Sequence, residues 1–386
     1  MTKSGKAQGN RGNDEYCIDG EQLAAVLAPR PRGLMTAAGS RMMLFFFRTY
    51  LPRFVIITAL GFFALVSGAS AGPSNAEIAA MKARYQRSTA IPYPKDNAFS
   101  TAKSALGREL FFDPRLSGTG KMSCATCHDP TLAWGDGRPT GIGSAGNRLD
   151  RHSPTILNLA FGELMFWDGR ADSLEEQSIG PIQNPAEMTN EMPRLIATLR
   201  AIPSYQASFA QAFPNEEISA ATIAKALATF ERTIVSGQAP FDRWVGGDEN
   251  AISEAAKRGF VTFNTTANCA SCHSGWRFTD DSFHDIGLHD DDIGRGAVIE
   301  GIPELQHAFK TPTLRNIAQR APYMHNGSIT TLEEVVRHYA GRFVRRPSLA
   351  VELHRLDVTA EDIQDVVAFL ETLTSVDPTF AEAKKQ

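Results

Sequence analysis

The sequence has little excess of charge of either sign and only five cysteines. Its 386 residues include 39 Lys or Arg and 43 Asp or Glu, which leaves a net charge of −4. This balance gives no basis for a nucleic-acid partner or for binding to an anionic membrane surface. The 31 glycines and 21 prolines follow no repeating period, so the chain is globular and rich in loops. Its length suggests about two domains.

Alternation of apolar and polar residues, which marks β-strands, is not sustained over several segments. Helical spacing is frequent instead, and Ser219 and Thr331 stand where helix N-caps are expected. The sequence therefore predicts a mainly α fold. The predicted helices cover 100–112, 189–200, 219–235, 253–264, 332–341 and 360–373.

The predicted organisation is an N-terminal extension followed by two small domains. Residues 1–71 form the extension, residues 72–240 the first domain and residues 241–386 the second. The boundary is placed in the Gly-, Pro- and Asp-containing stretch 238–250. The last helix belongs to the second domain in this scheme, although it could also pack back on the first.

The chain has one long apolar run, FVIITALGFFALVS at 54–67, with arginines before it and Ala69-Ser70-Ala71 after it. This pattern is typical of a secretory signal that is cut after Ala71. We therefore expect a periplasmic protein without stable membrane insertion. An uncleaved anchor is the alternative, but the run is short for a spanning helix. Met42 and Met43 leave the true start codon open.

Four of the five cysteines form two CxxC pairs, and a histidine follows each pair at once. The segments are Cys124-Ala-Thr-Cys127-His128 and Cys269-Ala-Ser-Cys272-His273, and Cys17 stands alone upstream. CxxCH is the attachment site of c-type haem. The two thiols form thioethers with the vinyl groups, and the adjacent imidazole becomes the proximal ligand of the iron.

Three other interpretations of the cysteine pairs were weighed. A zinc ribbon also uses paired CxxC units, but these pairs lie far apart and zinc does not require a histidine after each. A thioredoxin-like motif needs a βαβ context, which the sequence lacks. Structural disulfides in an oxidising compartment are the third alternative. Two haem c groups explain both histidines, and helices before both pairs suggest an internal duplication.

Several long motifs resemble the bacterial dihaem cytochrome c peroxidase and MauG family, in the order found there. The resemblance covers about Leu106 to Leu373. The motifs are LGRELFFDPRLSGTGKMSCATCH (106–128), SPTILN (153–158), FWDGRADSLEEQSIGPIQNPAEM (166–188), CASCH (269–273), KTPTLRN (310–316), APYMHNGS (321–328) and TLEEVVRHY (331–339).

The resemblance implies that the first haem, with His128 on its iron, is the site of peroxide reaction. Glu187 matches the acid of the distal pocket, where a carboxyl group can move a proton between the two peroxide oxygens. Gln177 and Pro181 match other positions that line this pocket. Trp167 matches the tryptophan between the haems, which relays an oxidising equivalent. Without the motif, Glu187 would be taken as a surface residue and Trp167 as a core residue.

The second haem has His273 as its proximal ligand, and the resemblance implies that Tyr339 is the other axial ligand. Typical peroxidases of the family have methionine at this position, whereas MauG has tyrosine. Thioether is a soft ligand that favours reduced iron, whereas phenolate stabilises oxidised iron. Met324 and His338 are rival ligands, and a buried aromatic residue on a helix face is the structural alternative.

Two further positions bear on the MauG-like branch, which includes MauG and MbnH. No histidine occurs at 129–151, where typical peroxidases carry a distal histidine, so the first haem should be open to peroxide. The resemblance also implies a calcium ion held by the side chain at 152 and the carbonyl groups of Arg320 and Pro322. Residue 152 is His152, a poor calcium ligand, so calcium is left open.

The predicted enzyme is a peroxidase-type oxidoreductase that uses hydrogen peroxide to form a high-valent dihaem state. That state oxidises an external donor, which we expect to be Trp or Tyr of a partner protein. The MauG substrate itself is not supported, because its contact tryptophan is replaced by Ala267 and Trp276 is displaced. The alternatives are a cytochrome c peroxidase that takes electrons from a donor cytochrome or cupredoxin, and a dihaem electron carrier.

Overall fold

The computed structural model describes residues 72–88, 90–353, 356 and 358–375. The signal segment, its cleavage site and Cys17 lie outside the described residues. Within them, no helix is both long and apolar enough to cross a membrane. Helices dominate, and the only regular sheet in this part of the chain pairs β1 (Phe283–His284) with β2 (Phe309–Lys310) in antiparallel register.

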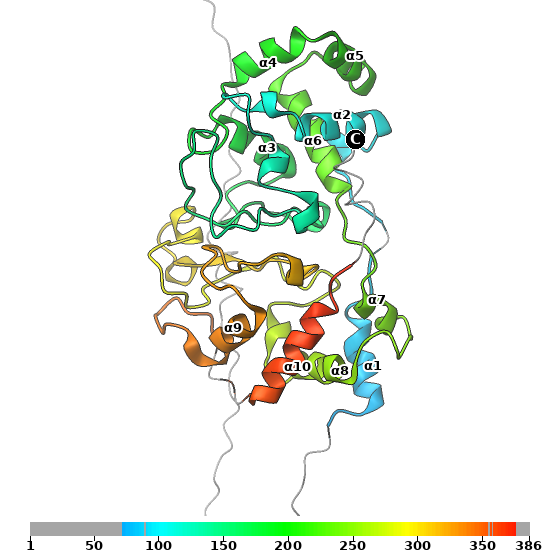
Figure 1. Ribbon diagram of the computed structural model, residues 1–386, viewed down its shortest axis with the longest axis vertical. Coiled ribbons are helices and arrows are strands. Elements are labelled where there is room, and N and C mark those ends of the chain that lie inside the picture. Colours follow the sequence, from blue (N-terminus) through cyan, green and yellow to red (C-terminus); the bar gives the residue numbers. More distant parts are fainter. Residues whose placement is uncertain (1–71, 89, 354–355, 357, 376–386) are drawn as a thin grey trace, which may run out of the picture. The chain divides into compact units, whose positions relative to one another are not determined.

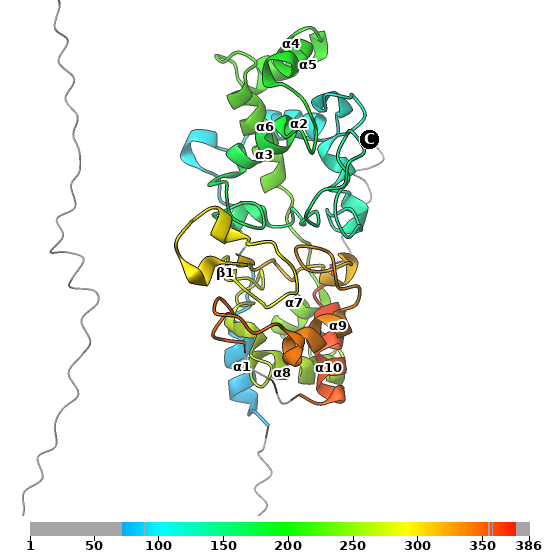
Figure 2. The same ribbon diagram turned by 90° about the vertical axis from the view of Figure 1, so that its left-hand side faces the viewer.

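Two groups of helices make up the described chain (Figures 1 and 2). The first group is α2 (Thr101–Phe111), α3 (Leu174–Gln183), α4 (Met192–Arg200), α5 (Pro203–Ala212) and α6 (Ala220–Arg232), and the second is α1 (Asn75–Ala83), α7 (Pro240–Val245), α8 (Glu254–Asn264), α9 (Leu332–Arg337) and α10 (Ala360–Glu371).

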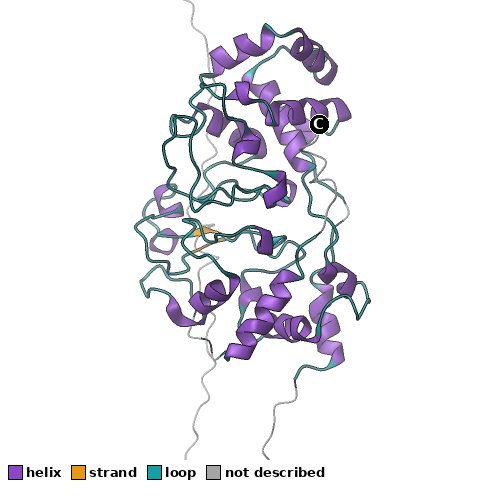
Figure 3. Cartoon of the chain, in the orientation of Figure 1, coloured by secondary structure: helices purple, strands orange, loops and turns teal. Residues whose placement is uncertain are grey.

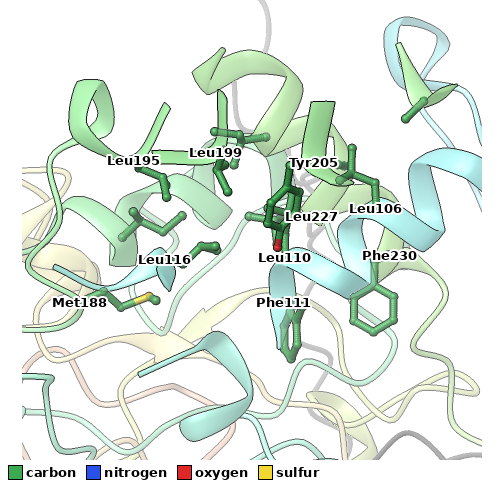
Figure 4. Close-up of a cluster of buried hydrophobic side chains, with 14 of the residues drawn as sticks. Leu106, Leu110, Phe111, Leu116, Met188, Leu195, Leu199, Tyr205, Leu227 and Phe230 are labelled. Atoms are coloured by element: carbon green, nitrogen blue, oxygen red, sulfur yellow. The ribbon is translucent and has the colours of Figure 1, made fainter. Parts of the chain in front are cut away.

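The first group is held together by α2 against α6, with α4 and α5 covering one side. Leu106, Leu110 and Phe111 project from α2 into this core and meet Leu227 and Phe230 of α6 (Figure 4). All five are at least nine-tenths buried. Their 3–4-residue spacing is the apolar stripe of an amphipathic helix, so the local pattern and the packing agree.

The second group repeats this helix pair with α8 against α10. Each pair crosses at a glycine where a Cβ atom would clash with the opposite backbone. A Cβ on Gly107 would lie 2.0 Å from the Ala226 carbonyl oxygen, and one on Gly259 would lie 1.8 Å from that of Asp365. The two crossings support the internal duplication that the CxxCH units suggest.

The second core is aromatic and includes helix α1, which precedes the first group in the chain. Tyr85, directly after α1, stacks on Phe278 with 4.8 Å between the ring centroids. Phe241 of α7 lies in the same cluster. Residues 72–88 therefore pack with the second half, whereas the sequence assigned them to the first domain. The last helix, α10, also packs in this core and not on the first half.

Loops connect the helices to the two CxxCH segments and lie between the two groups of helices (Figure 3). The segments 129–153 and 274–330 contain no α-helix, as the sequence predicts. Their shape is set in part by residues in left-handed conformation, including Trp134 and Phe278. A cation also joins the loops: Arg151 forms ion pairs with Asp168 at 2.6 Å and with Asp292 at 2.7 Å.

Candidate functional site

A cavity of about 920 Å³ is lined by residues from both halves of the described chain. His128 and Glu187 line it from the first half, and His273 and Tyr339 line it from the second. Trp167, from a loop of the first half, also contributes to the wall. The structure therefore brings the principal predicted site residues to one cavity, although they lie up to about two hundred residues apart in the sequence.

The two CxxCH segments have the same local structure. Each opens with a short 3₁₀ turn, Cys124–Thr126 in one case and Cys269–Ser271 in the other. The His128 amide donates to the Cys124 carbonyl at 3.0 Å, and the His273 amide donates to the Cys269 carbonyl at 2.9 Å. The turn therefore fixes each histidine with respect to its pair of thiols.

Both imidazole rings are oriented by a backbone carbonyl group. His128 Nδ1 lies 3.1 Å from the Trp134 oxygen, and His273 Nδ1 lies 2.9 Å from the Phe278 oxygen. A carbonyl oxygen can only accept, so Nδ1 carries the proton and Nε2 keeps its lone pair. Burial lowers the pKa of both rings, which also favours the neutral form that binds iron.

The thiols do not form the alternative sites that the sequence left open. All four cysteines of the two pairs are free, so no disulfide joins them. The pairs do not converge on a common zinc ion: among the described residues, the one group with metal-like spacing is Cys272 with Asp280 and His284. Hydrogen bonding to Asp280 raises the pKa of His284 to about 10. The two separate thiol pairs, each followed by a histidine whose Nδ1 is held by a backbone carbonyl group, fit two haem groups.

Glu187 lines the cavity together with Gln177 and Pro181 of helix α3. Burial raises the pKa of the Glu187 carboxyl group, while a hydrogen bond from Asn184 lowers it. Asn184 Nδ2 donates to Glu187 Oε1 at 2.7 Å. A carboxyl group with one oxygen held and a raised pKa keeps its proton more readily than an exposed glutamate, which suits a group that both accepts and donates a proton. The bond to Asn184 could not be inferred from the motif alone.

Trp167 is held by its indole nitrogen. Nε1 donates to the backbone carbonyl oxygen of His152 at 2.8 Å, and the Trp167 carbonyl accepts from the Lys310 amide at 2.8 Å. The ring lies 6.5 Å from that of His325, which stacks on Phe309 at 3.5 Å between centroids. Trp167 therefore contacts both halves, and its N–H group faces a neutral acceptor instead of a base.

Tyr339 and His273 also line a smaller apolar pocket of about 50 Å³. Tyr339 lies in a π-helical turn, His338–Arg342, that directly follows α9. Such turns are frequent at functional sites. Burial raises the pKa of the Tyr339 hydroxyl, and the nearby Cys269 and Cys272 raise it further. The phenol is thus close to the second CxxCH segment.

The rival ligands of the second site are placed differently. His338 Nε2 lies 2.8 Å from the Ile286 carbonyl oxygen, so the nitrogen carries a proton and is already engaged. Met324 lines the large cavity, although it is not part of the small pocket that Tyr339 shares with His273. The geometry thus favours Tyr339 over Met324 and argues against His338.

The predicted calcium positions do not fit a calcium ion. His152 Nδ1 lies 2.7 Å from the Arg138 carbonyl oxygen, which leaves an imidazole nitrogen where calcium requires oxygen. Arg320 and Pro322 were predicted to contribute only their backbone carbonyl oxygens, and the Arg320 side chain adds a guanidinium group to the same cavity. Calcium binds six to eight oxygen atoms, several of them from carboxylates. A site that contains an imidazole and a guanidinium group is therefore unsuited to calcium.

Comparisons with known proteins agree with the two CxxCH segments. The di-haem cytochrome c peroxidase family model matches residues 101–250, and the cytochrome c family model matches residues 256–374. The sequence is 50% identical over 308 residues to the methylamine utilization protein MauG of Methylorubrum extorquens, covering 79% of this chain and 87% of that protein. It is 35% identical to the cytochrome-c peroxidase IdrP1 of a Pseudomonas species, covering 75% of this chain and 85% of that protein.

A solved structure supports the same assignment. The crystal structure of a MauG-like protein associated with microbial copper homeostasis has a TM-score of 0.69 and 34% identity, covering 76% of this chain and 95% of that chain. The mainly α fold with two cytochrome c-like domains is thereby confirmed, as is the prediction of a peroxidase-type oxidoreductase. Two such domains imply two haem c groups, and the family acts on hydrogen peroxide. The chain belongs to the family of di-haem cytochrome c peroxidases and MauG proteins.

Proposed function

We propose that this protein uses hydrogen peroxide to withdraw electrons from an aromatic side chain of a partner protein. The first haem would be attached at Cys124 and Cys127, and the second at Cys269 and Cys272. When bound, the two groups supply the redox-active irons. His128 and His273 would hold these irons through Nε2, because Nδ1 of each ring donates to a backbone carbonyl group.

Glu187 is the residue that we assign to proton transfer from and to peroxide. Asn184 holds Oε1, so Oε2 is the atom that would accept the first proton of hydrogen peroxide. The same atom would return that proton to the outer oxygen, which leaves as water. Gln177 and Pro181 would shape the pocket around the peroxide. The raised pKa of Glu187 supports this role, because both steps require a group that gains and loses a proton readily.

Trp167 is the residue that we assign to electron transfer between the two halves. Its N–H donates to the His152 carbonyl oxygen, which cannot take up a proton at neutral pH. The indole would therefore carry an oxidising equivalent as a cation, without proton loss, and return to its resting form without proton uptake. This would keep exchange between the halves fast in both directions.

The choice of a partner protein as the electron donor rests on the position of Tyr339. The phenol shares the small pocket with His273, and no histidine occurs at 129–151 to block the first site. A phenolate ligand favours oxidised iron, so the second half would store an oxidising equivalent. A stored equivalent suits a slow reaction with a large partner, by long-range electron transfer through the protein surface.

A cytochrome c peroxidase that takes electrons from a small donor cytochrome or cupredoxin is the second candidate. It is favoured by Met324, which lines the same cavity and offers the sulfur ligand that favours reduced iron. A dihaem electron carrier is less consistent with the geometry, because a carrier needs no acid such as Glu187 beside an open iron.

The test compares two donors after one equivalent of hydrogen peroxide has been added to the fully oxidised protein. One donor is a reduced monohaem cytochrome c, and the other is N-acetyltryptophanamide. Our proposal predicts a long-lived oxidised state that the indole compound consumes, with little turnover of the cytochrome. Rapid steady-state turnover with the cytochrome, and no reaction of the indole, would instead establish the second candidate.

We also propose that the protein is periplasmic, because the arginines, the apolar run and Ala69-Ser70-Ala71 form an export signal. Haem c is attached outside the cytoplasm, so export and the two CxxCH segments support one another. The N-terminal sequence of the protein isolated from its native host would begin at Gly72 if the cut follows Ala71.

A further inference from the structure

Arg320 has a guanidinium group that lines the cavity without a full set of partners. One terminal nitrogen, Nη2, donates to the Thr313 carbonyl oxygen. The Nε atom is buried and has no hydrogen-bond partner among the described residues. Burial lowers the pKa of Arg320 to about 10, and the only charge that acts in the opposite direction is that of Tyr323. No described carboxylate therefore balances this cation.

Such a group is unfavourable unless an anion joins it. A charge that is withdrawn from water without a partner is destabilising, and an unsatisfied donor adds to that cost. Arg315 provides a contrast within the same protein: it is fully buried, but its Nη2 lies 2.9 Å from Asp242 Oδ1. The charge of Arg315 is thus balanced by a carboxylate of the protein. Arg320 has no such carboxylate and can pair with an anion that enters the cavity.

Four acidic residues of the cavity wall already have positively charged or imidazole partners, so they are not free to neutralise Arg320. Asp168 and Asp292 share Arg151, Asp281 pairs with Arg277, and Asp290 lies 3.0 Å from His325. The influences on the Arg320 charge also include no other Asp or Glu of the described chain, so we expect the missing anion to come from outside the polypeptide.

The charge of Arg320 acts at the junction of the two halves. Arg320, His152 and His273 line the same cavity, where burial and, to a smaller extent, the Arg320 charge lower the pKa of both histidines. His152 is the residue whose carbonyl oxygen accepts the Trp167 N–H. An anion bound by Arg320 would therefore lie between the second CxxCH segment and the indole. This is the neighbourhood of His152, Arg320 and Pro322, where the residues do not fit calcium.

We propose that Arg320 binds a carboxylate of the cofactor attached at Cys269 and Cys272. Haem carries propionate groups, and a guanidinium group binds carboxylate through parallel N–H bonds. Nε and a terminal nitrogen would form these bonds. Arg320 would thereby supply, as a permanent part of the chain, the positive charge that a metal ion could otherwise provide between the two sites. The inference rests on the proposed attachment of haem at the second CxxCH segment.

The experiment measures the midpoint potentials of both haems in the holoprotein by spectroelectrochemical titration. Removing a positive charge beside an iron favours its oxidised form. Arg320→Gln should therefore lower the equilibrium constant for reduction of the second haem roughly tenfold. For a one-electron couple this lowers the midpoint potential by about 59 mV. Arg320→Lys keeps the charge and should retain most of the wild-type potential. The first haem should shift less than the second in Arg320→Gln.

The matched control is Arg345→Gln, which removes the same charge from an exposed position of the second half. Its potentials should match those of the wild type, because water screens that charge. Metal analysis of the wild type should find no stoichiometric calcium. Unchanged potentials in Arg320→Gln would overturn the proposal, and so would one bound calcium per chain whose removal by a chelator alters the haem spectra.

Two further readouts separate this proposal from the proposed function. The haem content of each variant shows whether two groups are attached, and stoichiometric peroxide addition shows whether the first site reacts. Arg320→Gln could contain two haems, react normally with peroxide and keep the wild-type potentials. That result would refute the role assigned to Arg320 and leave the proposed function intact. If Arg320→Gln does not fold, the potential of Arg320→Lys and the calcium content of the wild type decide the question.

Discussion

The two halves of the molecule share the CxxCH turn and the orientation of its histidine, but they contribute different side chains to the cavity. His128 and His273 follow similar turns and donate Nδ1–H to a carbonyl group. The other lining residues differ, since the first half contributes Glu187 and the second half contributes Tyr339. A duplicated unit can therefore keep the features that hold a cofactor and change only those that select its chemistry. In our proposal the first half reacts with peroxide and the second half stores the oxidising equivalent.

The largest expected effect comes from Glu187→Gln, which removes the acid of the first half. The amide cannot accept the first proton of peroxide, so the reaction with peroxide should slow by about 10²–10⁴-fold. Stopped-flow absorbance of the oxidised protein gives this rate. Glu163→Gln changes an exposed glutamate of the same half and should react normally. A wild-type rate in Glu187→Gln would leave this residue without a role in proton transfer.

Tyr339→Met tests the distal side of the second half. A thioether in place of the phenolate favours reduced iron, so the midpoint potential of the second haem should rise by at least about 59 mV, a tenfold change in the equilibrium. The low-spin spectrum of that haem should change in Tyr339→Phe as well. Tyr323→Phe is the control, because Tyr323 lines the large cavity but not the small pocket. If the spectrum is the same in Tyr339→Phe, Met324 becomes the favoured ligand.

Asn184→Ala should change the pH dependence of the first half alone. The carboxylate form of Glu187 accepts the proton, so the rate should rise with pH through the Glu187 pKa, which burial raises above the usual range of glutamate. The Asn184 bond lowers this pKa, so its loss should move the rise to higher pH. Asn147→Ala is the control. It removes a hydrogen bond to the carbonyl oxygen of Ala186, the residue before Glu187, and should leave the pH dependence of the rate unchanged. A profile that is the same in both variants would contradict the assignment.

The smallest effects concern the stability of each half. Ser219 caps α6 and Ser253 caps α8 by accepting from a backbone amide one turn on. Replacing either serine with alanine should lower the free energy of unfolding by about 1 kcal/mol. Calorimetry then shows whether both variants shift the same transition. Two transitions, each sensitive to one variant, would mean that the duplicated halves unfold separately.

The sequence predicted helices where an apolar stripe and a cap occur together. α2, α6, α8 and α10 lie within the predicted ranges, and Ser219 is the N-cap of α6. Helix α3 was missed because Gly180 and Pro181 lie within it and local propensity argues against a helix there. Packing of α3 against α6 stabilises the helix despite its low local helix propensity. α1, α5 and α7 were also missed, since each is short or begins at a proline.

The site was predictable only as far as motifs name residues. CxxCH identifies the thiols and the histidines, and the resemblance identifies Glu187, Trp167 and Tyr339. Motifs do not identify the carbonyl groups that accept from the two histidines. These acceptors, at Trp134 and Phe278, depend on left-handed backbone conformations that no motif specifies. The unbalanced charge of Arg320 is likewise a property of the packed structure. A sequence shows that an arginine is present, but not that four carboxylates of the same cavity already have other partners.

The central claim is that the two distal sides differ in function, and one measurement tests it most directly. One equivalent of hydrogen peroxide is added to the protein with both irons oxidised and no reductant present, and the electron paramagnetic resonance signals of both haems are recorded. The account predicts that both signals disappear together and that the new state persists. If neither signal changes until the second haem has been reduced, the two halves act as in a cytochrome c peroxidase that requires reduction first, and the account is wrong.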